Sequence, residues 1–203
     1  QYLHLQKISE YKITNIVFMG MGEPFLNYDN TIESANLLHH PEGINMGAWR
    51  ITISTAGIIR KINQYTRERH PYKLAVSLNA SNELQRLKTM PITKSNSFKE
   101  LINSSKNYTL QTKKKITFEY VMLSNINDSS SDARALIRQL GSINCKLNLI
   151  PYNEIDGDFK RPSNEKIDNF LKILAHAPFP VTIRWSKGQE IDAGCGQLAT
   201  MHE

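Results

Sequence analysis

The residue best suited to covalent chemistry is a cysteine flanked by glycines near the end of the chain. Cys195 lies in the stretch "DAGCGQL", between Gly194 and Gly196, and is one of only two cysteines in 203 residues. Glycines remove the side chains that would pack around a core thiol, and they allow a close approach of the backbone. We therefore predict that Cys195 is a catalytic residue. Cys145 opens an apolar run instead, so we interpret it as a core thiol.

Two further groups follow apolar segments in the first third of the chain. The stretch "GMGEPFLN" puts Gly22 and Glu23 directly after one segment, where a carboxylate can pair with an ammonium group. The stretch "STAG" puts Ser54 at the end of the next, where hydroxyls can bind a ligand carboxylate. A glycine turn with a solvated acid, and simple helix capping, explain the same residues without a ligand.

Polar residues also follow two later segments. Ser77 and Asn79 alternate with apolar neighbours in "SLNA", and Asn153 follows Pro151 in "NLIPYN". Each of these positions alone is more often structural than functional. Taken together, they place polar side chains at the ends of four segments, which a shared sheet would bring to one edge.

The elements that must position these residues alternate between two kinds. Short apolar runs rich in β-branched residues predict buried strands, and stretches of helical spacing lie between them. Alternation of this kind predicts parallel βαβ units, with ligands bound at the carboxyl ends of the strands. The predicted strands are 13–19, 50–55, 73–78, 116–123, 145–150 and 181–185, and the predicted helices are 29–40, 56–69, 95–112, 130–142 and 163–177.

Composition narrows the class of protein. The formal net charge is +6, which favours a polyanionic partner such as nucleic acid, although a basic solvated surface gives the same value. Two cysteines cannot form a disulfide framework, so we expect a reducing, cytoplasmic compartment. We find no apolar run long enough to span a membrane and no signal peptide. The six histidines show no metal-ligand spacing, and we predict no metal-binding residue.

Six motifs in one order resemble a known family. They are "GMGEPFLN", "ITISTAGI", "LAVSLNA", "FEYVMLSNIND", "NLIPYN" and "GQEIDAGCGQLA". Together they resemble the radical S-adenosylmethionine (SAM) methyltransferases of the RlmN type, which modify C2 of adenosine in 23S rRNA and tRNA. The Cfr-type enzymes, which methylate C8, are close relatives. The resemblance runs from about residue 13 to residue 199, nearly the whole chain.

The resemblance implies an α/β fold, an incomplete (β/α) barrel of the radical-SAM type with parallel strands and helices outside. It implies SAM and a [4Fe–4S] cluster as cofactors, 23S rRNA and tRNA as substrates, and an electron donor for the cluster. Cys195 resembles the cysteine that carries the methyl group. By the same resemblance, the SAM-binding residues are Gly22, Glu23, Ser54, Ser77, Leu78, Asn79 and Asn153.

The chain departs from the family pattern in two places. The Cys-x3-Cys-x2-Cys motif that ligates the cluster is absent, and it should precede residue 13, after a strand that this chain does not contain. Asn79 stands where the family usually has histidine. We therefore expect residues 1–203 to be one partial methyltransferase core domain from the C-terminal part of a longer enzyme. Alone, this part should bind no cluster and be inactive.

Two other functions remain open. A non-catalytic barrel that lost its cluster could bind RNA or a protein partner, and cysteines in the family spacing upstream of residue 1 would argue against it. An unrelated barrel acting on small molecules would explain the strand ends but not the motif around Cys195.

Overall fold

A computed structural model describes residues 1–20, 22–154 and 158–185. Its six strands form one parallel sheet in which every strand pairs with its sequence neighbours, in the order β1-β2-β3-β4-β5-β6. The predicted α/β architecture with a parallel sheet is therefore confirmed. The strands are β1 (Ile16–Phe18), β2 (Ile51–Thr55), β3 (Lys73–Ser77), β4 (Ile116–Met122), β5 (Cys145–Pro151) and β6 (Val181–Ile183).

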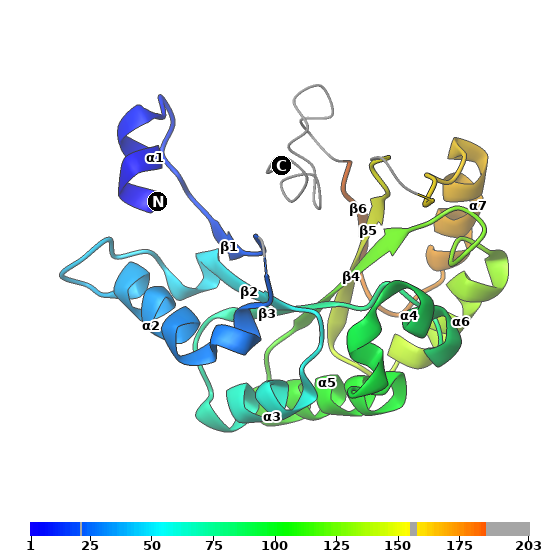
Figure 1. Ribbon diagram of the computed structural model, residues 1–203, viewed down its shortest axis with the longest axis horizontal. Helices are drawn as coiled ribbons and strands as arrows, with labels where there is room; N and C mark the ends of the chain where they lie inside the picture. The colour runs from blue at the N-terminus through cyan, green and yellow to red at the C-terminus, as the bar shows by residue number, and fades with distance from the viewer. Residues whose placement is uncertain (21, 155–157, 186–203) are drawn as a thin grey trace.

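Helices connect the strands and cover the outer face of the curved sheet, at the bottom of Figure 1. Helix α1 stands apart from this layer, beside the start of β1. The helices are α1 (Tyr2–Ile8), α2 (Tyr28–His39), α3 (Ile59–Glu68), α4 (Glu83–Thr89), α5 (Phe98–Thr112), α6 (Ser130–Leu140) and α7 (Asn164–Leu174). Three short 3-10 turns are η1 (Pro24–Asn27), η2 (Ala48–Arg50) and η3 (Pro91–Lys94).

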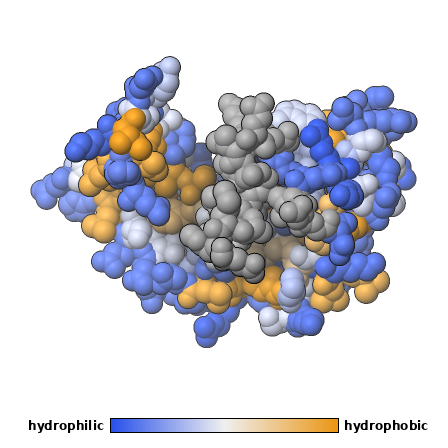
Figure 2. Space-filling model, turned by 45° about the horizontal axis from the view of Figure 1, so that its top comes forward, coloured by the Kyte–Doolittle hydropathy of each residue, from blue (hydrophilic) through white to orange (hydrophobic). Residues whose placement is uncertain are grey.

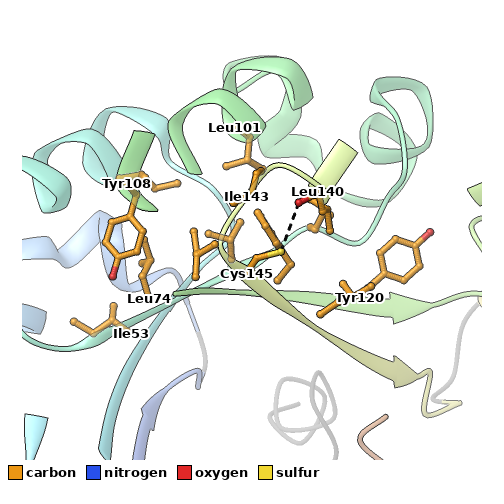
Figure 3. Packing of buried hydrophobic residues seen from close by; sticks show 14 of the residues in the cluster. Ile53, Leu74, Leu101, Tyr108, Tyr120, Leu140, Ile143 and Cys145 are labelled. Atoms are coloured by element: carbon orange, nitrogen blue, oxygen red, sulfur yellow. Dashed lines mark hydrogen bonds between the residues drawn. The ribbon is translucent and has the colours of Figure 1, made fainter. Parts of the chain in front are cut away.

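The hydrophobic core lies between the sheet and the helix layer. Leu74, Phe118 and Leu147 are fully buried there, on the face that the helices cover. Cys145 packs in the same core, with its Sγ 3.9 Å from the carbonyl oxygen of Leu140 (Figure 3). Burial raises the pKa of this thiol to about 12, so it is neither ionised nor accessible. The interpretation of Cys145 as a core thiol is confirmed.

The opposite face of the sheet carries polar side chains in a row across four strands. Ser77 pairs with Glu119, Glu119 with Asn148, and Asn148 with Thr182. Paired residues of neighbouring strands point to the same face, so these four side chains line the inner surface of the curved sheet. The sheet thus separates an apolar outer core from a polar interior.

Strand β1 forms one edge of the sheet, and an open apolar cleft of about 980 Å³ lies along it. Leu3, Val17 and Leu37 line this cleft from α1, β1 and α2, and each is more than half exposed. Figure 2 shows apolar surface on this side of the molecule. Among the described residues the outer edge of β1 has no partner strand, and such an edge beside apolar side chains is a surface on which further chain can pack.

Several predicted boundaries differ from the structure. Strand β1 is shorter than predicted, and α2 begins at Tyr28 with Asn27 as its N-cap, so Asp29 is not the first residue of this helix as predicted. Asp29 lies in the first turn instead, where a negative charge still favours the helix dipole. Strand β5 ends at Pro151, one residue later than predicted. Helices α1 and α4 were not predicted.

Candidate functional site

Glu23 joins the ends of the first two strands. Gly22 precedes it with φ of 85°, a left-handed conformation that favours glycine. The two carboxylate oxygens of Glu23 then accept hydrogen bonds from Phe25 N at 2.9 Å and from Ala56 N at 2.6 Å. Glu23 is therefore held as a fixed negative charge at the carboxyl ends of β1 and β2.

The loop that follows β2 is organised by its own hydroxyls. Ser54 is buried in the strand, and Thr55 Oγ1 accepts from Gly57 N at 3.0 Å. Gly57 has φ of 108°, and a Cβ at this residue would lie 3.1 Å from Nη2 of Arg86. This turn therefore requires glycine, and it brings the backbone close to a buried guanidinium group.

The end of β3 places three predicted contacts in different settings. Ser77 is partly exposed on the inner face, whereas the side chain of Leu78 is fully buried. Asn79 has φ of 53°, which asparagine tolerates better than most residues. Its Oδ1 accepts from Val121 N at 2.9 Å, and its Nδ2 lies 3.5 Å from the sulfur of Met90. Asn79 thus ties the end of β3 to β4.

A buried arginine holds the ends of β2 and β3 together. Arg86 on α4 is fully buried, and it donates from Nη2 to the carbonyl oxygens of Ala56 and Ser77. Its Nε donates to Leu78 O at 3.2 Å, and its Nη1 donates to Thr93 Oγ1 at 2.9 Å. Burial lowers the pKa of Arg86 to about 10, so the group stays charged at neutral pH. One cation therefore satisfies three strand-end carbonyls.

A buried asparagine performs a similar task on the other side of the site. Nδ2 of Asn127 donates to the carbonyl oxygens of Asn79 at 2.9 Å and of Val121 at 2.8 Å. Its Oδ1 accepts from Leu123 N at 2.7 Å. The ends of β3 and β4 are consequently joined by amide side chains from both directions. This arrangement makes the edge rigid without using secondary structure.

Of the last two predicted site residues, the structure describes Asn153 but not Cys195. Asn153 follows β5 and is buried, at the same end of the sheet as the other predicted contacts. Cys195 lies outside the described residues. We name the edge formed by Glu23, Ser54, Ser77, Leu78, Asn79 and Asn153 the strand-end rim.

A buried acid lies on the inner face of the sheet, within β4. Glu119 on the inner face is only 6% exposed, and burial raises the pKa of its carboxyl, opposed by the positive charge of Arg184 and a hydrogen bond with Asn148. Thr182 in turn donates to Asn148 Oδ1. The interior of the curved sheet therefore holds a hydrogen-bonded polar network rather than an apolar filling.

The donor set fits SAM better than it fits an iron–sulfur cluster. Glu23 offers a carboxylate to the ammonium of an amino acid, and Ser54 and Ser77 offer hydroxyls on the neighbouring strands β2 and β3. Within the part of the chain that the structure describes, no group of three or more His, Cys, Asp or Glu side chains is placed to hold a metal ion. The described residues do not fit a [4Fe–4S] cluster, whose iron ions are held by several cysteines.

Sequence reasoning missed the residues that hold the rim in place. Arg86 lies on α4, whose start carries a usable signal: Asn82 Oδ1 accepts from Gln85 N at 3.0 Å, in a sequence with Asn and Gln three residues apart. Asn127 lies within the family motif "FEYVMLSNIND", but nothing in that motif indicates which groups its amide binds. Glu119 had a detectable signal as a charged residue inside an apolar strand.

Curated proteins resemble the chain along nearly its full length. It is 41% identical over 200 residues to a probable dual-specificity RNA methyltransferase RlmN of Leptospira interrogans (strain Fiocruz L1-130), covering 98% of this chain and 57% of that protein. A protein of the same name in Thermotoga petrophila is 42% identical over 198 residues, with 98% and 58% covered. The chain thus spans a little over half the length of these relatives. No protein-family model matches it.

Solved structures agree with the sequence comparison. A radical SAM methyltransferase from Sphaerobacter thermophilus superposes with a TM-score of 0.91 at 42% identity, over 97% of this chain and 57% of that one. A domain of pyruvate-formate lyase-activating enzyme from Bacteroides vulgatus shares the fold alone, with a TM-score of 0.66 at 13% identity over 85% of this chain and 99% of that one. By sequence and by fold, the chain is similar to RlmN-type radical SAM methyltransferases along nearly its whole length, which corresponds to a little over half of theirs.

Proposed function

We propose that the chain is part of a radical SAM RNA methyltransferase that methylates C2 of adenosine in 23S rRNA and tRNA. One observation carries the proposal: the predicted SAM contacts of the strand-end rim lie at the ends of parallel strands that Glu23, Arg86 and Asn79 tie together. Such an edge is where α/β folds bind ligands. The names of the relatives and the net charge of +6 support an RNA substrate.

Within this function the residues have separate tasks. Glu23 pairs with the amino group of SAM, and Ser54, Ser77, Asn79 and Asn153 bind its remaining polar atoms. Leu78 is fully buried, so its contribution is to fix the backbone between Ser77 and Asn79.

Bound SAM supplies the methyl group. Cys195 is the residue of this chain that carries the one-carbon unit to the base, in a methyl-cysteine intermediate. The glycines on either side of it let the thiol approach both the cofactor and a base that is turned out of its stack.

The remaining parts of the proposal concern the longer protein. The cluster and the electron donor act with a segment beyond these 203 residues, and the chain alone is inactive. The compartment is the cytoplasm, where thiols stay reduced. None of the helices among the described residues is long and apolar enough to cross a membrane.

The decisive experiment replaces Cys195 in the full-length protein and follows transfer of labelled methyl groups to RNA. The Cys195→Ala variant should lose methylation while it keeps its affinity for SAM, and Cys145→Ala serves as the matched control because that thiol is buried in the core. Retained turnover in Cys195→Ala would remove this residue from the mechanism. Analysis of the product separates C2 from C8 methylation, and a wild-type protein that binds RNA without methylating it would indicate a non-catalytic barrel.

A further inference from the structure

Two tryptophans stand at opposite ends of the sheet, and each has an arginine over its ring. Trp185 follows the carboxyl end of β6, with the guanidinium of Arg161 5.2 Å from its ring centroid. Trp49 precedes the amino end of β2, with Arg50 at 4.4 Å. The two rings are similarly accessible, 50% for Trp185 and 60% for Trp49. An exposed tryptophan with an arginine over its ring therefore lies at each end of the sheet, Trp185 near the strand-end rim and Trp49 at the amino ends of the strands.

Around Trp185 the aromatic and basic side chains come from two neighbouring strand ends. Tyr152 directly follows β5, and its ring meets that of Phe159 at 6.3 Å with an angle of 84°. Phe159 is 37% exposed. The ends of β5 and β6 lie side by side, near the top of the molecule in Figure 1. We name this surface the aromatic patch; it consists of Tyr152, Phe159, Lys160, Arg161, Arg184 and Trp185.

Backbone hydrogen bonds anchor the patch to the sheet. The carbonyl oxygen of Lys160 accepts from Ser124 N at 2.8 Å, just after β4. Arg161 N donates to Glu154 Oε1 at 3.0 Å, and Arg184 N donates to Leu149 O at 2.8 Å. The patch is therefore held in register with the strands that carry the rim.

The aromatic patch has a small excess of positive charge, which favours binding of a polyanion there. Lys160, Arg161 and Arg184 contribute three positive charges, against the acids Glu154 and Asp158 beside them. Lys160 lies 3.7 Å from Glu154, a pair in which both side chains are at least half exposed. Because both partners are accessible to water, this ion pair is weak, and a phosphate can compete for the lysine.

We propose that the aromatic patch binds nucleotides flanking the target base in single-stranded RNA, with one base stacked on Trp185 and phosphates near Arg161 and Arg184. Aromatic rings beside cations form the surface on which single strands stack, because every base has a planar face. A folded protein partner would use the apolar area without needing the cations. The inference rests on the proposed function, since it assigns the RNA to the same end of the sheet.

The test measures binding of a fluorescent single-stranded RNA of about 10 nucleotides with a central adenosine to the full-length protein. The Trp185→Ala variant should bind about tenfold more weakly, and Trp185→Phe should retain most of the affinity because a phenyl ring still stacks. Trp49→Ala is the matched control and should bind like the wild type. Arg161→Ala should weaken binding and reduce the dependence of log Kd on log salt by about one.

The outcomes separate this inference from the proposed function. Equal RNA affinity of the Trp185→Ala and wild-type proteins, or an equal loss in Trp49→Ala, would overturn the assignment of the patch. If the wild type methylates RNA and Trp185→Ala keeps its affinity, only the inference fails. If the wild type binds SAM but no RNA, both fail. Affinity for SAM is measured in every variant and should not change.

Discussion

Arg86 is the single residue on which the geometry of the strand-end rim most depends. It is fully buried, and its hydrogen bonds go to carbonyl oxygens of β2 and β3 ends and to a threonine hydroxyl. A buried charge of this kind is costly unless all its donors are used, and removing it leaves several acceptors without a partner.

Replacing Arg86 with methionine should therefore destabilise the protein by about 3 kcal/mol and lower Tm by about 10 °C. Affinity for SAM should fall in the same variant at temperatures where it is folded, because Ala56 and Ser77 lose their common partner. Calorimetry and SAM titration measure the two effects. Arg86→Lys keeps the positive charge but has fewer hydrogen-bond donors, so its stability and its affinity for SAM should lie between those of the wild type and Arg86→Met. If Arg86→Met has the stability and the SAM affinity of the wild type, the hydrogen bonds of Arg86 do not hold the strand-end rim in place.

A second prediction at the residue scale concerns Glu119 and the pH dependence of stability. Burial raises the pKa of its carboxyl above the ordinary value of 4.5 despite Arg184, the Asn148 hydrogen bond and Lys146. The folded protein therefore binds this proton more tightly than the unfolded chain, so stability is lost as pH rises above the ordinary carboxyl range. Glu119→Gln should be more stable than the wild type at pH 7, and the difference should vanish near pH 4. A variant that is less stable at pH 7 would show that the ionised form is favoured.

At the scale of elements, the turn between β2 and α3 shows how backbone conformation limits substitution. Gly57→Ala should destabilise by about 2 kcal/mol, because alanine is strained at φ of 108° and its Cβ would crowd Arg86 and Leu101. Gly20→Ala is the control: a Cβ there meets nothing within 4 Å, so its effect should stay within about 0.5 kcal/mol. Urea unfolding measures the loss of stability in both variants. Equal losses would show that alanine is not strained at residue 57.

The elements themselves were largely predictable, because their patterns are local. The β-branched runs that form β2, β4 and β5 and the capped helix α6 follow from periodicity and from Ser129, which accepts from Asp132 N. The positions of the polar rim residues were predictable from the strand ends, whereas Leu78 and the assignment of the rim to SAM came only from the resemblance. Arg86 and Asn127 act through carbonyl groups distant in sequence, and no local pattern announces which carbonyls a buried donor will meet.

At the scale of the whole molecule, the described residues provide the side chains proposed to bind SAM but no group of side chains that could ligate a cluster. The inner face carries a polar network and a rim suited to SAM, yet no described group of side chains suits a cluster. Along the edge strand β1, the apolar cleft of about 980 Å³ offers room for further chain. The matched segment covers 57% of a relative's length.

The chain of 203 residues should accordingly bind no stoichiometric iron or sulfide after anaerobic reconstitution. The reason is chemical: Cys145 is buried with a raised pKa, and a single remaining thiol cannot ligate four irons. Iron and sulfide assays with visible absorption spectra measure this. A brown protein with about four irons per chain would contradict the division of the site.

The central claim, that the strand-end rim holds SAM, is tested most directly by titrating SAM into the full-length wild-type protein and its Glu23→Gln variant. Glutamine keeps an acceptor for the backbone N–H groups of Phe25 or Ala56 but removes the charge that pairs with an ammonium group. The account predicts at least about tenfold weaker binding in Glu23→Gln and no change in Glu33→Gln, an exposed acid on α2. Equal affinity of Glu23→Gln and the wild type would contradict it.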